Sequence, residues 1–340
     1  MSTVRRLTNR RAQLCLFTVL VLIAVVSFSV ASSKQFGALA RNSLIWAPSI
    51  AADFDWAPGH APSTYLRELS EAPPVIVQAT ASALTSTSAT DLQKATDVGR
   101  FVGDNPRHGK PIQSDTLTTY KQVKQNGRGY CADYSQLFLA FANSAGLPAR
   151  EWGFGLHGFD AGHAFNEFYA RDLEKWVFID IFHSFYVVDG KSRLPLSALE
   201  FQQRLLANSA DQSIEIVAIA ASQFDLHTPE RAIAYYARGA RYFYLLWGDN
   251  VFSYDNHPVV KWASRLSRSL EVLVAVMWGV QPQIRISPYS DQGEAVTGLK
   301  TIRALLLGAA AALFLGSLAL LAQLIAHRSH DRPSTGRPSR

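Results

Sequence analysis

The stretch Gly127-Arg-Gly-Tyr-Cys-Ala-Asp-Tyr-Ser135, together with the residues after it, sets the local structure of the middle of this chain. Apolar side chains recur at helical spacing from residue 131 to residue 145, and Gly146 provides a helix stop signal. The sequence therefore predicts a helix over residues 131–145. Cys131 would lie in its first turn, directly after a glycine-containing segment.

Two runs of strand-forming residues follow the predicted helix. They are His163-Ala-Phe-Asn-Glu-Phe-Tyr169 and Lys175-Trp-Val-Phe-Ile-Asp-Ile181, and the short charged segment between them predicts an antiparallel hairpin. If residue 163 pairs with residue 180 or 182, His163 and Asp180 face the same side, because side chains alternate along a strand. A carboxylate late in a buried strand needs a partner, and His163 is the natural one.

Helices and strands are also expected on both sides of this hairpin. The aromatic-rich residues 235–247 are interpreted as a helix face that packs on the core or at a membrane surface. The expected helices cover residues 91–103, 116–124, 196–207, 229–247 and 258–280, and a further strand covers residues 150–155.

Cys131 is the residue whose role needs an explanation. A free cysteine is often a small buried apolar residue, and this interpretation stays open. The first turn of a helix, however, stabilises a thiolate, and its backbone N–H groups can stabilise an oxyanion. A thiolate nucleophile also needs a base and a group that orients the base. We expect His163 to take the thiol proton and Asp180 to fix the imidazole tautomer and stabilise the imidazolium.

These three blocks resemble those of the transglutaminase-like superfamily of papain-related folds. The order matches: a Cys that opens a helix, a His that starts a strand and an Asp on the next strand, with Trp176 also in place. The resemblance covers about residues 90–190 and implies that Cys131 is the nucleophile, His163 the base and Asp180 the third triad member. It also implies an α+β, papain-like/transglutaminase-like core, in which the helix bearing the Cys packs on an antiparallel sheet.

The same resemblance implies thioester-mediated acyl transfer from an amide, or its hydrolysis. The amide would be a glutamine side chain, a peptide bond or an isopeptide bond. Phe165 stands where the family commonly has Trp, a departure that bears on packing. No upstream residue matches the family's second oxyanion donor, and Gln125 and Asn126 are the candidates. Some relatives need calcium, but no oxygen-rich loop supports that here, so no cofactor is expected.

Other polar residues near the predicted site are interpreted structurally. The helix dipole favours an acid such as Asp133 in a first turn, and orienting a loop is the alternative role. His157, His163 and His183 have neither i, i+4 spacing nor a local carboxylate signature. The sequence therefore predicts no metal site.

The composition excludes several classes of protein. The chain has 340 residues, of which 48% are hydrophobic, and this is too apolar for a disordered protein. Its two cysteines, Cys15 and Cys131, exclude a disulfide scaffold. The net charge of +6 comes from the two ends, since residues 1–11 carry +4 and residues 327–340 carry +3, which leaves −1 for the rest. A nucleic-acid partner is therefore not expected.

Two uncharged apolar runs, residues 12–33 and 304–326, are each long enough to cross a bilayer as a helix. The arginines outside both runs predict that both termini lie in the cytoplasm and that the body faces the periplasm or exterior. A cleaved signal peptide is the alternative for the first run. The runs therefore predict an inner-membrane protein with two flanking transmembrane helices.

The resulting expectation is a membrane-anchored enzyme that acts on a protein or peptide. The alternatives are a catalytically silent binding module with envelope-protein partners, or a scaffold whose two membrane helices are the functional part. The expected parts are residues 1–33 (basic start and transmembrane helix), 34–89 (spacer), 90–195 (catalytic domain), 196–302 (helical extension), 303–326 (transmembrane helix) and 327–340 (basic cytoplasmic tail).

Overall fold

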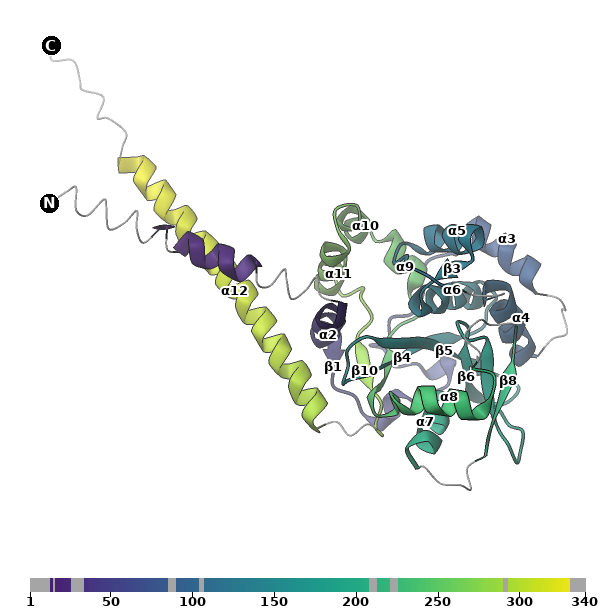
Figure 1. Cartoon of the computed structure of the whole chain (residues 1–340). Coiled ribbons are helices and arrows are strands. Elements are labelled where there is room, and N and C mark those ends of the chain that lie inside the picture. Colours follow the sequence, from purple (N-terminus) through teal and green to yellow (C-terminus); the bar gives the residue numbers. More distant parts are fainter. Residues whose placement is uncertain are drawn as a thin grey trace, which may run out of the picture. The chain divides into compact units, whose positions relative to one another are not determined.

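The computed structural model describes residues 13–14, 16–25, 34–84, 90–103, 107–207, 213–220, 226–289 and 293–330. The chain divides into two compact units. One is Ile45–Ala295, and the other joins Met1–Leu44 to Val296–Arg340. The unit Ile45–Ala295 contains the sheet and the helices that cover it (Figure 1).

An eight-stranded sheet forms the centre of the unit Ile45–Ala295, with the strand order β1-β10-β9-β4-β5-β6-β7-β8. Neighbouring strands are antiparallel except β1 and β10, which are parallel. A separate parallel pair joins β2 (Arg107–His108) to β3 (Arg128–Gly129). The strands of the large sheet are β1 (Trp46–Ala47), β4 (Ala149–Gly155), β5 (Gly162–Ala170), β6 (Lys175–Asp180), β7 (Phe185–Asp189), β8 (Ile214–Ala218), β9 (Phe243–Leu246) and β10 (Ile284–Ile286).

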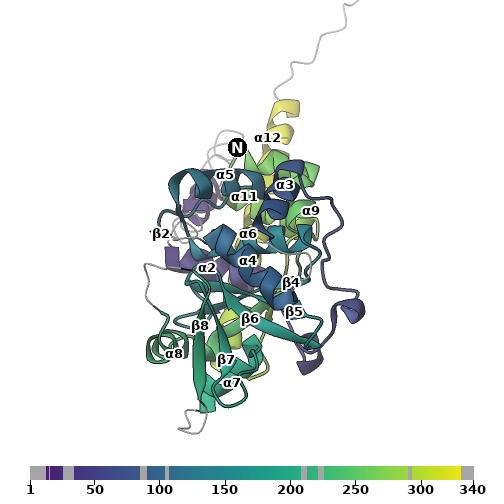
Figure 2. The same cartoon turned by 90° about the vertical axis from the view of Figure 1, so that its right-hand side faces the viewer.

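Helices cover both faces of this sheet (Figures 1 and 2). Helices α3 to α6 lie on one face, and α7 and α8 lie on the other. The helices are α2 (Lys34–Ile45), α3 (Pro74–Ala83), α4 (Asp91–Gly103), α5 (Thr116–Asn126), α6 (Cys131–Ser144), α7 (Ala198–Ala207), α8 (Pro229–Ala237), α9 (Val251–Asn256), α10 (Pro258–Ser264), α11 (Arg268–Met277) and α12 (Gly293–His330).

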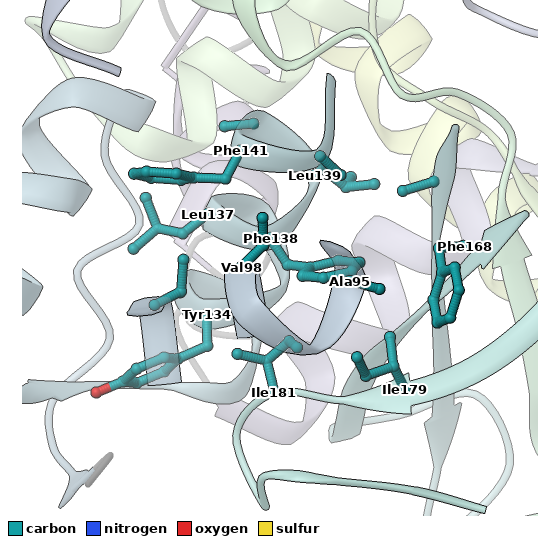
Figure 3. Packing of buried hydrophobic residues seen from close by; sticks show 14 of the residues in the cluster. Ala95, Val98, Tyr134, Leu137, Phe138, Leu139, Phe141, Phe168, Ile179 and Ile181 are labelled. Carbon is teal, nitrogen blue, oxygen red and sulfur yellow. The ribbon is translucent and has the colours of Figure 1, made fainter. Parts of the chain in front are cut away.

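Helix α6 runs through the core on the first face. Its side chains are apolar on most sides, which is typical of a helix that is buried all round. Leu137, Phe138 and Phe141 are at most 1% exposed, and they share one hydrophobic cluster with Val98 of α4 and Ile179 of β6 (Figure 3). This packing fixes the helix that carries Cys131 against the strands that carry His163 and Asp180.

The elements predicted between residues 91 and 207 are confirmed. The helix expected over residues 131–145 is α6, and the expected hairpin is β5 and β6 joined by a turn at residues 171–174. The helices expected at 91–103, 116–124 and 196–207 and the strand at 150–155 are also present, each within two residues of the predicted ends. The fold is α+β, with the Cys-bearing helix packed on the antiparallel strands β4 and β5.

The structure differs from the predicted spacer over residues 34–89. Phe54, Trp56 and Tyr65 are buried in the hydrophobic cluster on the second face of the sheet, and α3 packs against α6. Single aromatic residues anchor the part of the chain between β1 and α3, and they leave no periodic pattern in the sequence. Residues 85–89, also part of the predicted spacer, lie outside the described residues.

A buried arginine explains why this segment folds onto the sheet. Arg150 on β4 is 1% exposed, and its guanidinium lies 4.0 Å from the ring centroid of Trp176. Its Nε donates to Glu167 at 2.7 Å, and its Nη2 donates to the carbonyl of Phe54 at 3.0 Å. The indole of Trp176 donates to the carbonyl of Trp56 at 2.7 Å. Buried donors on β4 and β6 thus require acceptors from residues 54–56.

The predicted helical extension contains strands as well as helices. The helix expected over residues 229–247 ends after α8, and β9 follows and pairs with β4. Its aromatic residues suit a strand with two covered faces, so tertiary packing overrides the helical pattern. The helix expected over residues 258–280 is split into α10 and α11, because the Ser267 side chain caps a new helix by accepting from the Leu270 N–H at 3.2 Å.

One helix in the described part of the chain is long and apolar enough to cross a membrane. It is Gly293–Gln323, within α12, with a mean hydropathy of 2.4. Of the first predicted span, residues 12–33, the structure describes an apolar helix over Leu16–Val25, and residues 12, 15 and 26–33 lie outside the described residues. Within this unit Leu20 lies against Gly316, where an added Cβ would come within 2.6 Å of its side chain. The glycine therefore permits close contact between these two apolar helices.

Candidate active site

Cys131 is the first residue of α6 and is 6% exposed. Tyr130 precedes it in an extended conformation, and its N–H donates to the carboxylate of Asp133 at 2.8 Å. This local bond satisfies one of the N–H groups that a helix start leaves without an acceptor in the helix. Cys131 thus occupies the predicted place, at the positive end of the helix dipole.

Asp133 has a second role besides its favourable interaction with the helix dipole. Its side chain is buried and also accepts from the backbone N–H groups of Ile112 and Gln113, at 3.0 and 2.9 Å. The carboxylate therefore joins the loop before α5 to the start of α6. The alternative weighed from the sequence, an orienting role for Asp133, is the one that the structure supports.

His163 and Asp180 come together at one end of the β5–β6 hairpin. Nε2 of His163 lies 2.9 Å from Oδ2 of Asp180, and the two residues are 4% and 0% exposed. Asn166 pairs with Ile179, and this register places His163 opposite residue 182, one of the two pairings expected. The predicted proximity of His163 and Asp180 is confirmed.

Asp180 accepts from two further donors. The Tyr236 hydroxyl donates to Oδ2 at 2.6 Å, and the backbone N–H of His183 donates to Oδ1 at 3.0 Å. Burial raises the pKa of Asp180, but the nearby His163 and His183 and the hydrogen bonds outweigh burial and lower this pKa to about 2. Asp180 is therefore an anion at neutral pH.

His163 is held between this anion and Cys131. Burial lowers the pKa of His163, whereas Tyr235, Asp180 and a hydrogen bond to Cys131 raise it, and the net pKa lies well above the ordinary value. Because Nε2 faces Asp180, Nδ1 is the ring nitrogen left for the thiol. The imidazole can thus take a proton from Cys131 while Asp180 stabilises its charged form.

Aromatic rings enclose the imidazole. Phe165, the residue that departs from the Trp expected from the resemblance, stacks on the His163 ring at 6.5 Å and 16° between planes. Phe154 and Tyr235 lie at 5.7 and 5.5 Å between centroids. These rings exclude water from the pair and strengthen its electrostatic interaction.

His183 joins the site, and His157 does not. The His157 side chain is 78% exposed, so the three histidines considered together from the sequence do not meet. In the described chain, ligand atoms of His163, Asp180 and His183 lie within 4.8 Å of one another and could hold a metal ion. Such an ion would compete with the His163–Asp180 hydrogen bond. The absence of a metal stays a prediction.

Tyr235 and Tyr236 are the residues near the site that the sequence interpretation missed as site residues. Both come from α8, and the sequence indicated only that residues 235–247 pack as an aromatic face. Tyr236 is fully buried, yet its hydroxyl bonds to Asp180, which is 56 residues away in sequence. The two oxyanion candidates, Gln125 and Asn126, are exposed on the last turn of α5.

Comparison with known proteins supports the resemblance. Residues 78–181 match the family model described as the transglutaminase-like superfamily. No curated protein matches the chain significantly. A solved structure of a "putative protease" from Parabacteroides distasonis is 18% identical, with a TM-score of 0.23, over 30% of this chain and 22% of that one. The aligned region thus spans less than a quarter of that protein.

The matched region begins within α3 and ends one residue after β6. It contains Cys131, His163 and Asp180, and it starts earlier than residue 90, where the catalytic domain was expected to begin. The early start agrees with the packing of α3 on α6. Residues 78–181 of this chain are therefore a transglutaminase-like superfamily domain.

Proposed function

We propose that this protein is a membrane-anchored cysteine enzyme that transfers or hydrolyses the acyl group of an amide through a thioester. The observation that carries the proposal is the placement of His163: its Nε2 lies 2.9 Å from Oδ2 of Asp180, and Cys131 is among the groups that raise its pKa. This is the arrangement of nucleophile, base and orienting group that acyl transfer requires. Cys131 is the nucleophile, His163 the base and Asp180 the orienting residue.

The reaction follows from this geometry. Cys131 gives its proton to Nδ1 of His163, and the thiolate attacks the carbonyl carbon and forms a C–S bond. Nδ1 then protonates the nitrogen of the leaving amine, the C–N bond breaks, and a thioester remains. Water or an acceptor amine attacks the thioester, its proton passes to His163, and the C–S bond breaks to restore the thiol.

The start of α6 offers an oxyanion donor. The Cys131 N–H belongs to the first helical turn, where N–H groups have no acceptor within the helix. It can donate to the negative oxygen of the tetrahedral intermediate, and the helix dipole adds to this stabilisation. The substrate class is a protein or peptide amide: a glutamine side chain, a peptide bond or an isopeptide bond.

Membrane attachment is the second part of the proposal. The apolar segment Gly293–Gln323 of α12 and the apolar helix Leu16–Val25 support it. The arginines at both ends of the sequence favour cytoplasmic termini and a body that faces the periplasm. Substrates and partners would then be envelope proteins or peptides.

A catalytically silent binding module is the second candidate, and one observation favours it. Cys131, His163 and Asp180 are each at most 6% exposed. Two cavities in the described chain, of about 350 and 630 Å³, are lined by other residues. A substrate would need the rings near His163 to move before it could reach Cys131. The experiment below separates the two candidates.

The test is the pH dependence of Cys131 alkylation by iodoacetamide, in full-length protein with Cys15→Ser. An ordinary thiol is only about 0.3% ionised at pH 6. If His163 ion-pairs with Cys131, alkylation stays fast at pH 6, and His163→Ala slows it roughly tenfold or more. His157→Ala, which removes an exposed histidine, is the matched control and should change nothing.

Two results distinguish the enzyme from the binding module. Slow alkylation at pH 6 that does not depend on His163 would contradict the enzyme and favour the binding module. Fast, His163-dependent alkylation would support the enzyme, and a panel of glutamine, peptide and isopeptide amides would then be screened for release of the amine.

A further inference from the structure

Helix α8 lies outside the matched domain, yet it reaches into the candidate triad. The Tyr236 hydroxyl donates to Oδ2 of Asp180 at 2.6 Å. The same oxygen lies 2.9 Å from Nε2 of His163. Tyr236 and His163 therefore share one acceptor atom, and removing the Tyr236 hydroxyl changes the environment of the oxygen that holds the imidazole.

Packing alone does not require a hydroxyl at this position. The Tyr236 ring is buried against Phe154, Phe178 and Phe201, with centroids 5.3, 5.5 and 5.2 Å away. Phenylalanine would fill the same space and keep these contacts. A buried phenol also occurs without a hydrogen bond in the described chain, at Tyr65. The bond to Asp180 is therefore a specific feature of Tyr236.

The chain just before α8 holds the other oxygen of the carboxylate. The His183 N–H donates to Oδ1 of Asp180 at 3.0 Å, and Nε2 of His227 donates to the His183 carbonyl at 2.9 Å. Residues 227–236 thus fix Oδ2 directly and Oδ1 through the turn after β6. Rotation of the carboxylate away from His163 would break both contacts.

These donors also replace water around a fully buried charge. Burial disfavours the ionised carboxylate, and hydrogen bonds to the anion restore it. Tyr236 supplies one of these bonds. Only the ionised Asp180 stabilises the His163 imidazolium that forms when Cys131 gives up its proton.

We propose that Tyr236 is a positioning residue of the Cys131–His163–Asp180 site: its hydroxyl holds Oδ2 of Asp180 in line with Nε2 of His163. This inference rests on the proposed function. It makes α8, which lies outside the matched domain, a required part of the active centre.

The test compares Tyr236→Phe with Tyr254→Phe in the full-length Cys15→Ser protein. Tyr254 also donates to a buried carboxylate, that of Glu271 at 3.1 Å, and is not among the contacts of the candidate triad. Iodoacetamide alkylation of Cys131 is followed from pH 3 to pH 9, and the melting temperature is measured for each variant. Without the phenol, Oδ2 of Asp180 loses a fixed donor and can turn away from Nε2 of His163. The imidazolium is then less stabilised, so a Cys131 thiolate paired with it takes up a proton at higher pH. We expect the acidic midpoint of the profile to rise by about one pH unit in Tyr236→Phe and to stay in place in Tyr254→Phe.

The outcomes separate this inference from the function on which it rests. If the wild-type profile depends on His163 and a folded Tyr236→Phe variant has the same profile, the role of Tyr236 alone is overturned. A wild-type profile indifferent to His163 overturns both. If Tyr236→Phe does not fold, 3-fluorotyrosine at position 236 keeps the ring and donates more strongly. The midpoint should then move to lower pH, and an unchanged midpoint would overturn the role of Tyr236.

Discussion

At the scale of single residues, Asp133 links two segments of the chain. It is 1% exposed and accepts from the backbone N–H groups of Tyr130, Ile112 and Gln113. These hydrogen bonds are partly buried, so each N–H that loses this acceptor costs free energy. The carboxylate therefore stabilises both the start of α6 and the loop before α5.

Asp133→Ala should lower the free energy of unfolding by about 3 kcal/mol, because it removes the shared acceptor of three partly buried N–H groups. Asp115→Ala is the matched comparison, since Asp115 caps α5 by accepting from the Thr118 N–H at 3.0 Å. That variant should lose about 1 kcal/mol. Denaturant unfolding measures both values, and equal losses would contradict the linking role of Asp133.

At the scale of elements, an ion pair joins the start of α4 to the β5–β6 turn. Asp91 accepts from the backbone N–H, Nε and Nη2 of Arg171, at 3.0, 2.7 and 2.7 Å. The Arg171 side-chain hydrogen bond lowers the pKa of Asp91 to about 2, although burial opposes this shift. The contact ties a helix on one face of the sheet to the hairpin that carries His163 and Asp180.

The pKa of Asp91 determines how the stabilisation from the Asp91–Arg171 contact changes with pH. Because folding lowers the pKa of Asp91 from 3.8 to about 2, its stabilisation is present above about pH 4 and is lost as pH falls towards 2. Asp91→Asn should cost about 1 kcal/mol at pH 7, since Arg171 is half exposed and solvent screens the pair. The variant should also lose less stability than wild type between pH 4 and pH 2.

Asp172→Asn removes the same charge from an exposed position in the same turn and is the control. Thermal unfolding from pH 2 to pH 7 measures all three proteins. If the two variants respond alike, net charge explains the effect and the Asp91–Arg171 contact does not.

At the scale of the whole molecule, the sequence places a body of about neutral charge between two apolar segments with basic ends. The apolar part of α12 covers 31 residues. No residue in its most apolar stretch is buried. A helix of this length and composition is stable in a bilayer. The proposed topology follows if both apolar segments insert.

Cysteine labelling tests this topology in a background with both native cysteines replaced, Cys15→Ser and Cys131→Ser. Leu194→Cys lies on the body at an exposed position, and Ser339→Cys lies in the C-terminal tail. A membrane-impermeant maleimide should label Leu194→Cys in cells whose inner membrane is intact, and Ser339→Cys only after this membrane is permeabilised. The opposite pattern would invert the orientation, and labelling of both would contradict a membrane between them.

Local patterns in the sequence predicted the triad because each of its parts has a local cause. The glycine-containing segment before Cys131 and the helical spacing after it placed this residue at a helix start, and strand alternation brought His163 and Asp180 to one face. Tyr236 was not predictable in this way, because only the folded chain brings α8 to the end of β6. The buried segment containing Trp56 was missed for the same reason, since acceptors for Arg150 and Trp176 leave no periodic signal.

The edge of the sheet has a consequence for how the body is joined to the rest of the chain. Its first strand, β1, pairs in parallel with its last strand, β10, with Trp46 opposite Ile284. The first and last strands of the body therefore lie side by side, about 5 Å apart. Another domain whose first and last strands are neighbours could take its place between the same flanking segments.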